Sequence, residues 1–192
     1  PSYWIRYEIT GVVQQLVDAK AAVLSLKAIP HQRDWVAELQ QLQLKMEIAG
    51  TSRIEGAEFT DHELDVALDP REGAASLLTR SQRQARAAAE VYRWIANLPD
   101  DRPITEELVK EIHARLVVGC DDDHCPPGRI RGKDENVTFG FPRHRGCDGG
   151  PCCQTAFSGL IRAIQNEYRG HDPLIQAMAF HYHFAAMHPF LD

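Results

Sequence analysis

Apolar residues recur every three or four positions along most of this 192-residue chain, and the polar stretches between them are short. Such spacing places the apolar side chains on one face of an α-helix. A clear case lies between Ile9 and Leu26, and Pro30 ends it because proline cannot continue a helix. The pattern therefore predicts an all-α fold.

Capping signals and prolines divide the chain into separate helices. We expect helices over residues 9–26, 35–50, 60–67, 76–98, 105–119, 156–168 and 173–188. Thr60 and Glu63 form a capping-box pattern, Thr105 caps a later helix, and Asp172 with Pro173 begins the last one. On the last helix, one face carries Leu174, Met178, His181, Ala185 and His188.

The overall charge excludes one class of partner. The formal net charge is -6, from 27 acidic and 21 basic residues, whereas nucleic-acid surfaces usually carry a basic excess. No apolar run approaches the ~20 residues that a membrane-spanning helix needs, and the first residues lack a signal-peptide pattern. We therefore expect a cytoplasmic protein without nucleic-acid or membrane partners, built as one domain with an N-terminal helical extension.

Periodicity is lost between Cys120 and Gln154, where glycine and proline become frequent. Two short runs in this region, residues 129–131 and 137–139, could pair as a small β-hairpin across residues 132–136. An ordinary surface hairpin would show the same pattern. We interpret the region as a functional loop.

All five cysteines lie in this loop region, so they do not suggest a disulfide framework for the whole domain. Two pairs share a four-residue gap and have histidines nearby, which would suit a tetrahedral zinc site. The candidate ligands are Cys120, Cys125, Cys147 and Cys152, with Cys153, His124 and His144 close in sequence. Reduced thiols packed in a loop are the alternative.

The last five residues place a histidine and an aspartate around a proline that breaks the helix. His188 could act as a general base and Asp192 as a metal ligand. A packed core histidine and a terminal acid without a function would give the same sequence pattern. A second candidate is residues 51–56, Thr-Ser-Arg-Ile-Glu-Gly. Taken alone, this segment is also typical of a helix C-terminus with a surface glutamate and a terminating glycine.

Together these motifs resemble Fic-domain proteins over roughly residues 51–192. The ending His-Pro-Phe-Leu-Asp resembles the first half of the family signature, H-P-F-x-D/E followed by G-N-G-R, and residues 51–56 resemble the S/T-x-x-x-E-G motif of its inhibitory helix. Residues 127–132 with Asn136 and Val137 resemble the family's flap. The resemblance implies a Fic-type helical bundle with a small hairpin flap, an N-terminal helical region over residues 1–75 that carries the inhibitory motif, and a core over residues 76–192.

The resemblance also implies an activity: transfer of AMP from Mg-ATP to a serine, threonine or tyrosine hydroxyl of a target protein. His188 would be the general base, Phe190 the structural anchor of the motif, and Asp192 the magnesium ligand. Glu55 would restrain the enzyme by pairing with a nucleotide-binding arginine, and it could also serve removal of AMP. The whole inhibitory motif is Thr51, Ser52, Glu55 and Gly56. The residues expected to dock the target by β-augmentation are Arg129, Ile130, Arg131, Asn136 and Val137.

The second half of the family signature, which cradles the phosphates, is absent from the 192 residues. We therefore expect a core that is incomplete at its C-terminus, weak ATP binding and little or no turnover. An incomplete bundle would leave an apolar face uncovered, which predicts self-association, with a homodimer as one form. Two alternatives remain: an inactive Fic scaffold that serves interaction or regulation, and transfer of another phosphate-containing group.

Overall fold

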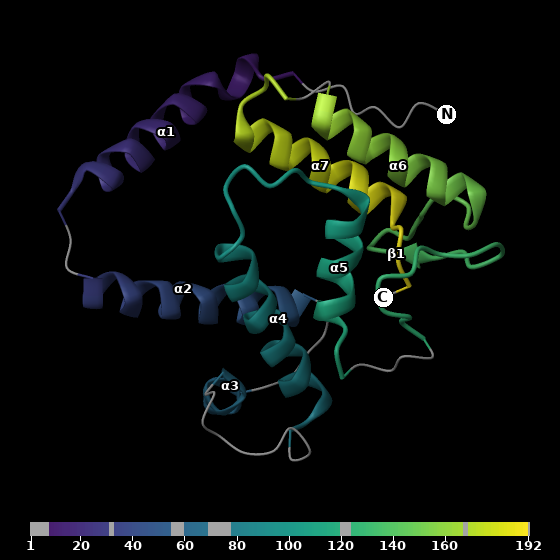
Figure 1. Ribbon diagram of the computed structural model, residues 1–192, viewed down its shortest axis with the longest axis horizontal. Helices are drawn as coiled ribbons and strands as arrows, with labels where there is room; N and C mark the ends of the chain where they lie inside the picture. The colour runs from purple at the N-terminus through teal and green to yellow at the C-terminus, as the bar shows by residue number, and fades with distance from the viewer. Residues whose placement is uncertain are drawn as a thin grey trace.

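The computed structural model describes residues 8–30, 33–54, 60–68, 78–119, 124–166 and 169–191. Within them the fold is all-α with one small antiparallel hairpin, which confirms the predicted class. The helices are η1 (Thr10–Val12), α1 (Val13–Ala28), α2 (Arg33–Ile54), α3 (Asp61–Leu68), α4 (Arg80–Ala96), α5 (Glu106–Leu116), α6 (Pro151–Asn166) and α7 (Pro173–Met187). The strands are β1 (Thr138–Phe139) and β2 (His144–Arg145). Figure 1 shows α6 and α7 side by side, with α5 linking them to α4 and the N-terminal helices.

Side-chain caps fix the starts of several helices. The capping box before α3 is formed as predicted: the Glu63 carboxylate accepts from the Thr60 N–H at 2.7 Å, and the Thr60 hydroxyl accepts from the Glu63 N–H at 3.2 Å. Asp172 caps α7 by accepting from the Leu174 N–H at 2.9 Å. A further box, between Thr79 and Gln82, starts α4 four residues later than expected. Local hydrogen bonding therefore sets these helix starts.

The end of α2 and the start of α6 also differ from the prediction. α2 continues through Gly50 to Ile54, because Ile48 and Ala49 are buried beside the glycine and their packing outweighs its cost of about 1 kcal/mol. α6 begins at Pro151, five residues before the predicted start at Ala156. Proline at the first helical position is pre-organised for a helix, so Pro151 belongs to α6 and not to the loop.

One apolar core joins α2, α3 and α4. Small alanines on α4 let the three helices approach closely, and the buried residues are Ile48, Ala49, Leu64, Ala67, Ala85 and Ala89. Arg86 adds a polar link by donating to the carbonyl oxygen of Ala67 at 2.8 Å, at the end of α3. The core therefore spans the predicted boundary at residue 75, since α4 follows that boundary and α2 and α3 precede it.

A second core lies between α5, α6 and α7. It is formed by Val109, Cys153, Ala156, Phe157, Leu160, Ile161, Ala163, Ile164, Met187 and Phe190. α6 supplies most of these side chains along one face, as the helical spacing of its apolar residues predicts. The end of α7 and the residues just after it are packed against this core, so the second core positions the predicted motif.

The face that α7 turns inward is not set by hydrophobicity alone. Ala179, His183 and Met187, spaced four residues apart, are buried, whereas Leu174 and Met178 are exposed. Both stripes are mostly apolar, so the sequence period could not choose between them. The stripe with His183 packs inward, and burial lowers the pKa of His183.

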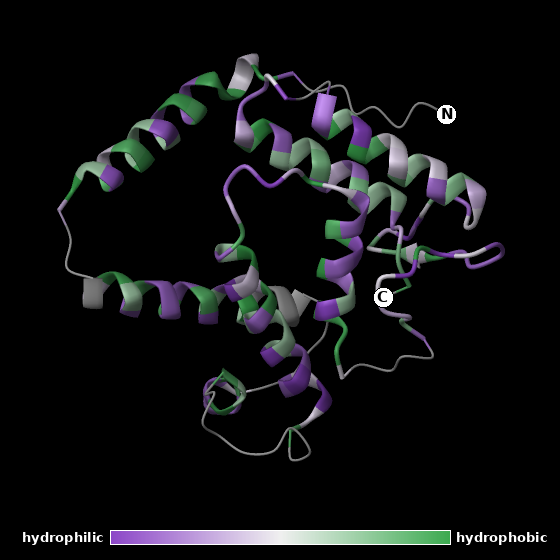
Figure 2. Ribbon diagram, in the orientation of Figure 1, coloured by the Kyte–Doolittle hydropathy of each residue, from purple (hydrophilic) through white to green (hydrophobic). Residues whose placement is uncertain are grey.

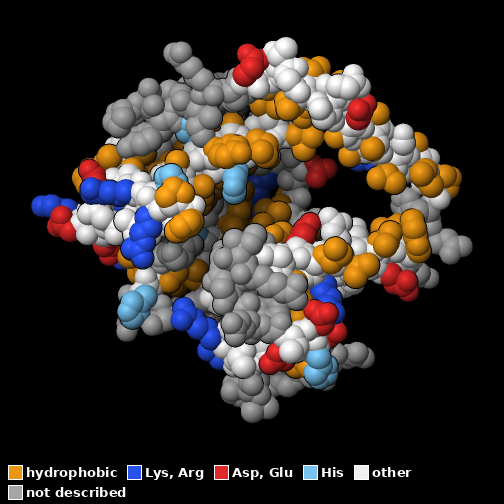
Figure 3. All heavy atoms as spheres, turned by 180° about the vertical axis from the view of Figure 1, so that it is seen from behind, with side chains coloured by type: hydrophobic (Ala, Val, Ile, Leu, Met, Phe, Trp, Pro, Cys, Tyr) orange, Lys and Arg blue, Asp and Glu red, His pale blue; other side chains and the backbone are white. Residues whose placement is uncertain are grey.

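The N-terminal helices extend away from the second core, and their apolar side chains are largely exposed. α1 has no buried residue, and Trp35, Leu39, Leu42 and Met46 of α2 are exposed. Hydrophobic residues run along both helices (Figure 2), and Figure 3 shows apolar side chains at the surface of α1 and α2. An ion pair between Lys20 and the α7 cap Asp172 ties α1 to α7. Among the described residues, no helix has the length and apolar character that crossing a membrane requires.

Candidate active site

His188 lies where α7 ends. Its backbone is left-handed, with φ 50° and ψ 72°, and its N–H donates to the carbonyl oxygen of Phe184 at 2.8 Å. Positive φ is uncommon outside glycine, although histidine adopts it more readily than most residues. Pro189 has no N–H and cannot continue the helix. The partly buried imidazole therefore sits at the point where the chain turns out of α7.

The ring of Phe139 covers one face of the His188 imidazole. The ring centroids lie 4.6 Å apart and the planes differ by 15°. Phe139 belongs to β1, which pairs with β2 so that Thr138 lies opposite Arg145 and Phe139 opposite His144. The hairpin thus contacts the histidine directly, and this flat contact limits how the imidazole can turn.

This hairpin differs from the predicted one. The prediction paired residues 129–131 with residues 137–139, but β1 pairs with residues 144–145. The Arg131 N–H donates to the carbonyl oxygen of Pro189 at 2.9 Å, and the Arg131 carbonyl accepts from the Gly150 N–H at 2.9 Å. Because these backbone groups already bond to the end of α7 and to the residue before α6, they are not available to a strand partner.

The other predicted docking residues also have contacts within the loop. Arg129 forms a two-pronged ion pair with Glu135, at 2.7 and 2.8 Å, and its guanidinium holds the pKa of that carboxyl below the usual value. Ile130 packs against the second core. The Asn136 side-chain oxygen accepts from the Gly149 N–H at 3.3 Å, and the Val137 carbonyl accepts from the Gly146 N–H at 3.2 Å. The loop therefore has its own internal order.

Arg131 is 1% exposed, although a charged loop residue is normally exposed. Its guanidinium donates to the carbonyl oxygens of His188 at 2.6 Å, Met187 at 3.0 Å, Cys147 at 2.7 Å and Glu135 at 2.6 Å. A buried charge is costly unless it is hydrogen-bonded, and four carbonyls meet that need. Arg131 therefore joins the loop to the residues around His188.

Phe190 is 2% exposed and lies in the second core. Its ring stacks on the imidazole of His113, with centroids 3.9 Å apart and planes within 9°, and meets Phe157 edge-on at 6.2 Å. The Nδ1 of His113 accepts from the Gly128 N–H at 2.9 Å. Sequence reasoning missed His113, although its position on the apolar face of α5, one residue after Ile112, was a visible signal.

Residues 103–192 match the model of the Fic/DOC family. This part of the chain corresponds to a Fic/DOC domain. The fold is also similar to two solved structures, a Fic family protein from Desulfovibrio desulfuricans and a segment of Fic-1 from C. elegans. The first has a TM-score of 0.78 at 20% identity over 97% of this chain, and the second has 0.73 at 13% over 96%. In both comparisons the chain spans only 54% of the other protein's length. No curated protein matches the chain significantly.

Several predicted residues of the Fic/DOC domain and its N-terminal region lie outside the described residues: Glu55, Gly56, Cys120 and Asp192. Thr51 and Ser52 belong to the last turn of α2. The described segment before Glu55 is therefore helical. The roles of these residues stay predictions.

The described cysteines of the domain do not gather into a metal centre. No group of three or more His, Cys, Asp or Glu residues that could hold a metal ion is found in the described parts of the chain. Cys125 lies 3.8 Å from the Nε2 of His113, and Cys147 and Cys153 interact with each other. Burial raises the pKa of Cys153 to about 12 and also raises that of Cys147. Zinc binding, which would also involve Cys120, stays a prediction.

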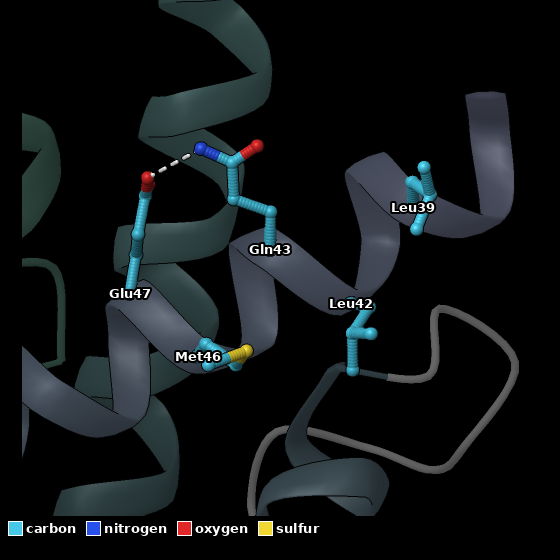
Figure 4. A pocket seen from close by; sticks show the side chains of 5 residues that line it. All are labelled: Leu39, Leu42, Gln43, Met46 and Glu47. Carbon is cyan, nitrogen blue, oxygen red and sulfur yellow. Dashed lines mark hydrogen bonds between the residues drawn. The ribbon is translucent and has the colours of Figure 1, made fainter.

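A hollow of roughly 460 Å³ on α2 lies away from the elements that carry His188. It is lined by Leu39, Leu42, Gln43, Met46 and Glu47. Figure 4 shows the Gln43 amide directed at the Glu47 carboxylate, to which it donates at 3.0 Å. Every lining residue belongs to one helix, so the hollow is part of the exposed surface of α2.

Proposed function

We propose that this protein is a Fic-type protein adenylyltransferase that transfers AMP from Mg-ATP to a hydroxyl side chain of a target protein. The observation that carries the proposal is the position of His188 at the left-handed end of α7, against the hairpin and within the region that matches the Fic/DOC family. A histidine at a helix end, with one face covered and partial exposure, can reach a bound hydroxyl and accept its proton.

In the proposed reaction His188 takes the proton from a serine, threonine or tyrosine hydroxyl. The hydroxyl oxygen forms a bond to the α-phosphorus of ATP, and the bond from that phosphorus to the bridging oxygen of pyrophosphate breaks. The products are the AMP-modified side chain and pyrophosphate, while the proton resides on His188. General-base assistance of this kind typically contributes about 10²- to 10⁴-fold in rate.

Asp192 is the residue proposed to hold Mg²⁺. A single carboxylate fits the ion's chemistry, since protein-bound Mg²⁺ often uses one or two carboxylates together with substrate phosphates and water. The ion would neutralise charge on the phosphates. Asp192 follows Phe190 by two residues, and the burial of Phe190 fixes where the chain departs from the core.

The hairpin is the proposed docking site of the target segment. A peptide could add to the exposed edge of a two-stranded sheet by backbone hydrogen bonds, and this would bring its hydroxyl close to the histidine that Phe139 contacts. Phe141, between the strands, is 100% exposed and could contact the same segment. These features support docking at the hairpin through β1 and β2.

Isotopic labelling tests the reaction. Incubation with ATP labelled at the α-phosphorus should label protein, whereas ATP labelled at the γ-phosphorus should not, because pyrophosphate leaves. His188→Ala should abolish labelling, and His181→Ala, at an exposed position of the same helix, should not. Incorporation from the γ-label only would favour transfer of another phosphate-containing group. No labelling by the folded natural protein would favour the inactive scaffold.

The length of the natural protein decides which chain is tested. An intact mass above 21.6 kDa, together with a C-terminal peptide that extends beyond Asp192, would mean that it continues past Asp192, and the labelling is then done with that longer chain. A mass equal to this value would favour the scaffold, because the phosphate-binding half of the signature would be absent.

We also propose that Glu55 restrains the activity by pairing with a nucleotide-binding arginine, and that it can assist removal of AMP. Glu55→Gly should raise self-labelling, and Glu58→Gly, a neighbouring acid outside the motif, is the matched control. Equal labelling of both variants and the unmodified protein would refute the restraint.

A cytoplasmic location belongs to this proposal. Cys147 and Cys153 carry free thiols, which are common in reducing compartments. Cell fractionation tests it, and recovery of the protein outside the cytoplasm would refute it.

A further inference from the structure

Three consecutive carbonyl groups at the end of α7 accept hydrogen bonds from one residue, Arg131. Its guanidinium donates to Met187 at 3.0 Å and His188 at 2.6 Å, and its backbone N–H donates to Pro189 at 2.9 Å. Arg131 lies 57 positions before His188 in sequence, so this is a tertiary contact and not a local cap. The central residue of the three is the proposed general base.

The end of α7 has only part of the usual backbone cap: the left-handed His188 donates its N–H to the Phe184 carbonyl at 2.8 Å. The last carbonyls of a helix need donors, and in a common C-terminal motif the N–H groups that follow the helix supply them. Pro189 has no N–H, and the Cys147 N–H, at 3.2 Å from the Met187 carbonyl, is a donor from outside the helix. The guanidinium of Arg131 donates to the carbonyls of Met187 and His188, and so replaces N–H donors that the proline cannot supply.

The same guanidinium also binds the loop that precedes α6. Its remaining hydrogen bonds go to the carbonyls of Cys147 and Glu135, both in the loop between α5 and α6. A guanidinium is a rigid planar fork, so four bonds from it define the relative position of the loop and of His188. Left-handed backbone at a non-glycine residue persists only where its surroundings hold it, and Arg131 provides such surroundings.

We propose that Arg131 is the positioning residue of His188: it holds the backbone of residues 187–189 so that the imidazole lies against Phe139. This inference rests on the proposed role of His188 as the general base. Arg131 touches neither substrate nor proton in this scheme. It acts through the conformation of the histidine.

The test compares Arg131→Gln and Arg131→Lys with Arg129→Gln. Arg129 lies two residues away, is exposed and pairs with Glu135, so its replacement removes a loop arginine without touching α7. Lysine keeps the charge but not the planar fork, so it should fail to restore the arrangement. Circular dichroism verifies that each variant keeps its helices.

The first readout is the NMR signal of the His188 ring, assigned with His188→Ala. The stacked Phe139 ring should shift it upfield in the natural protein, and both Arg131 variants should lose this shift while Arg129→Gln keeps it. The second readout is hydrogen exchange of the His188 amide, which should speed up about tenfold or more when a charge-assisted bond to its own carbonyl is lost. Neither readout needs activity, so failure of the proposed function would leave this test intact.

Where labelling is measurable, the Arg131 variants should lower kcat with KM for ATP little changed. A His188 signal that keeps its upfield shift, together with unchanged amide exchange, in folded Arg131→Gln would overturn the proposal. Full restoration of the signal by lysine would overturn the part assigned to the fork. Global unfolding of both variants would also overturn it, because Arg131 would then stabilise the whole domain and not His188 in particular.

Discussion

Replacing Phe190 with alanine should be among the most damaging single changes in this chain. The ring is 2% exposed, stacks on His113 at 3.9 Å and meets Phe157 edge-on. Removing a buried phenylalanine side chain costs about 3–5 kcal/mol through lost burial and the remaining cavity. With a midpoint shift of about 2–4 °C per kcal/mol for a domain of this size, the thermal midpoint should fall by roughly 6–20 °C.

Phe141→Ala is the matched control, since it removes the same atoms from a side chain that is 100% exposed. Its free energy of unfolding should stay within about 0.5 kcal/mol of the natural protein. Urea denaturation followed by circular dichroism measures both variants. A loss below about 1 kcal/mol for Phe190→Ala, or similar losses for the two, would refute the assignment of Phe190 as the anchor of the motif.

Four further substitutions test three local features by thermal unfolding. A Cβ at Gly149 would overlap a facing backbone carbonyl, so Gly149→Ala should destabilise the protein by about 1–3 kcal/mol. Gly159 lies in open space within α6, so Gly159→Ala should stabilise it by about 0.5–1 kcal/mol. Equal effects of the two substitutions would contradict this geometry. The pKa of Asp172 is lowered from 3.8 by Lys20 and the Leu174 N–H, so the stability that this carboxylate contributes is present above pH 3.8 and is lost as the pH falls below it. Asp172→Ala should lower the thermal midpoint at neutral pH, and its difference from the natural protein should shrink in acid. A difference that does not change with pH would argue against the cap. Because burial lowers the pKa of His183 from 6.5, the unfolded chain takes up the proton first and stability falls as the pH drops below 6.5. His183→Gln should reduce this loss of stability. An unchanged dependence of stability on pH would exclude His183 as its cause.

Local chemistry made part of the fold predictable. Thr60, Thr105 and Asp172 begin helices because each side chain accepts a nearby backbone N–H, and those partners lie two or three residues away in sequence. The inward face of α7 was not predictable in this way. Its two apolar stripes are close in hydrophobicity, so the choice depends on what α6 presents to it.

In the candidate site, too, the features set by local sequence were predictable and those set by tertiary contacts were not. His188 and Pro189 were visible in the sequence because the proline marks the helix end and the histidine precedes it. The register of the hairpin was not, since it depends on Arg131 being held by the end of α7. A loop arginine is normally exposed, and no local pattern indicates that this one is buried under carbonyls 57 positions away.

Two independent contacts restrict the proposed base, and both come from the loop between α5 and α6. Phe139 limits the imidazole from its face, and Arg131 holds the backbone on either side. A contact with the ring alone would leave the backbone free to leave its left-handed conformation, and a contact with the backbone alone would leave the ring free to rotate. Because one loop supplies both contacts, the position of His188 depends on the fold of that loop. The loop is rich in glycine and proline and has no apolar periodicity, so its ordered structure could not be predicted from the sequence.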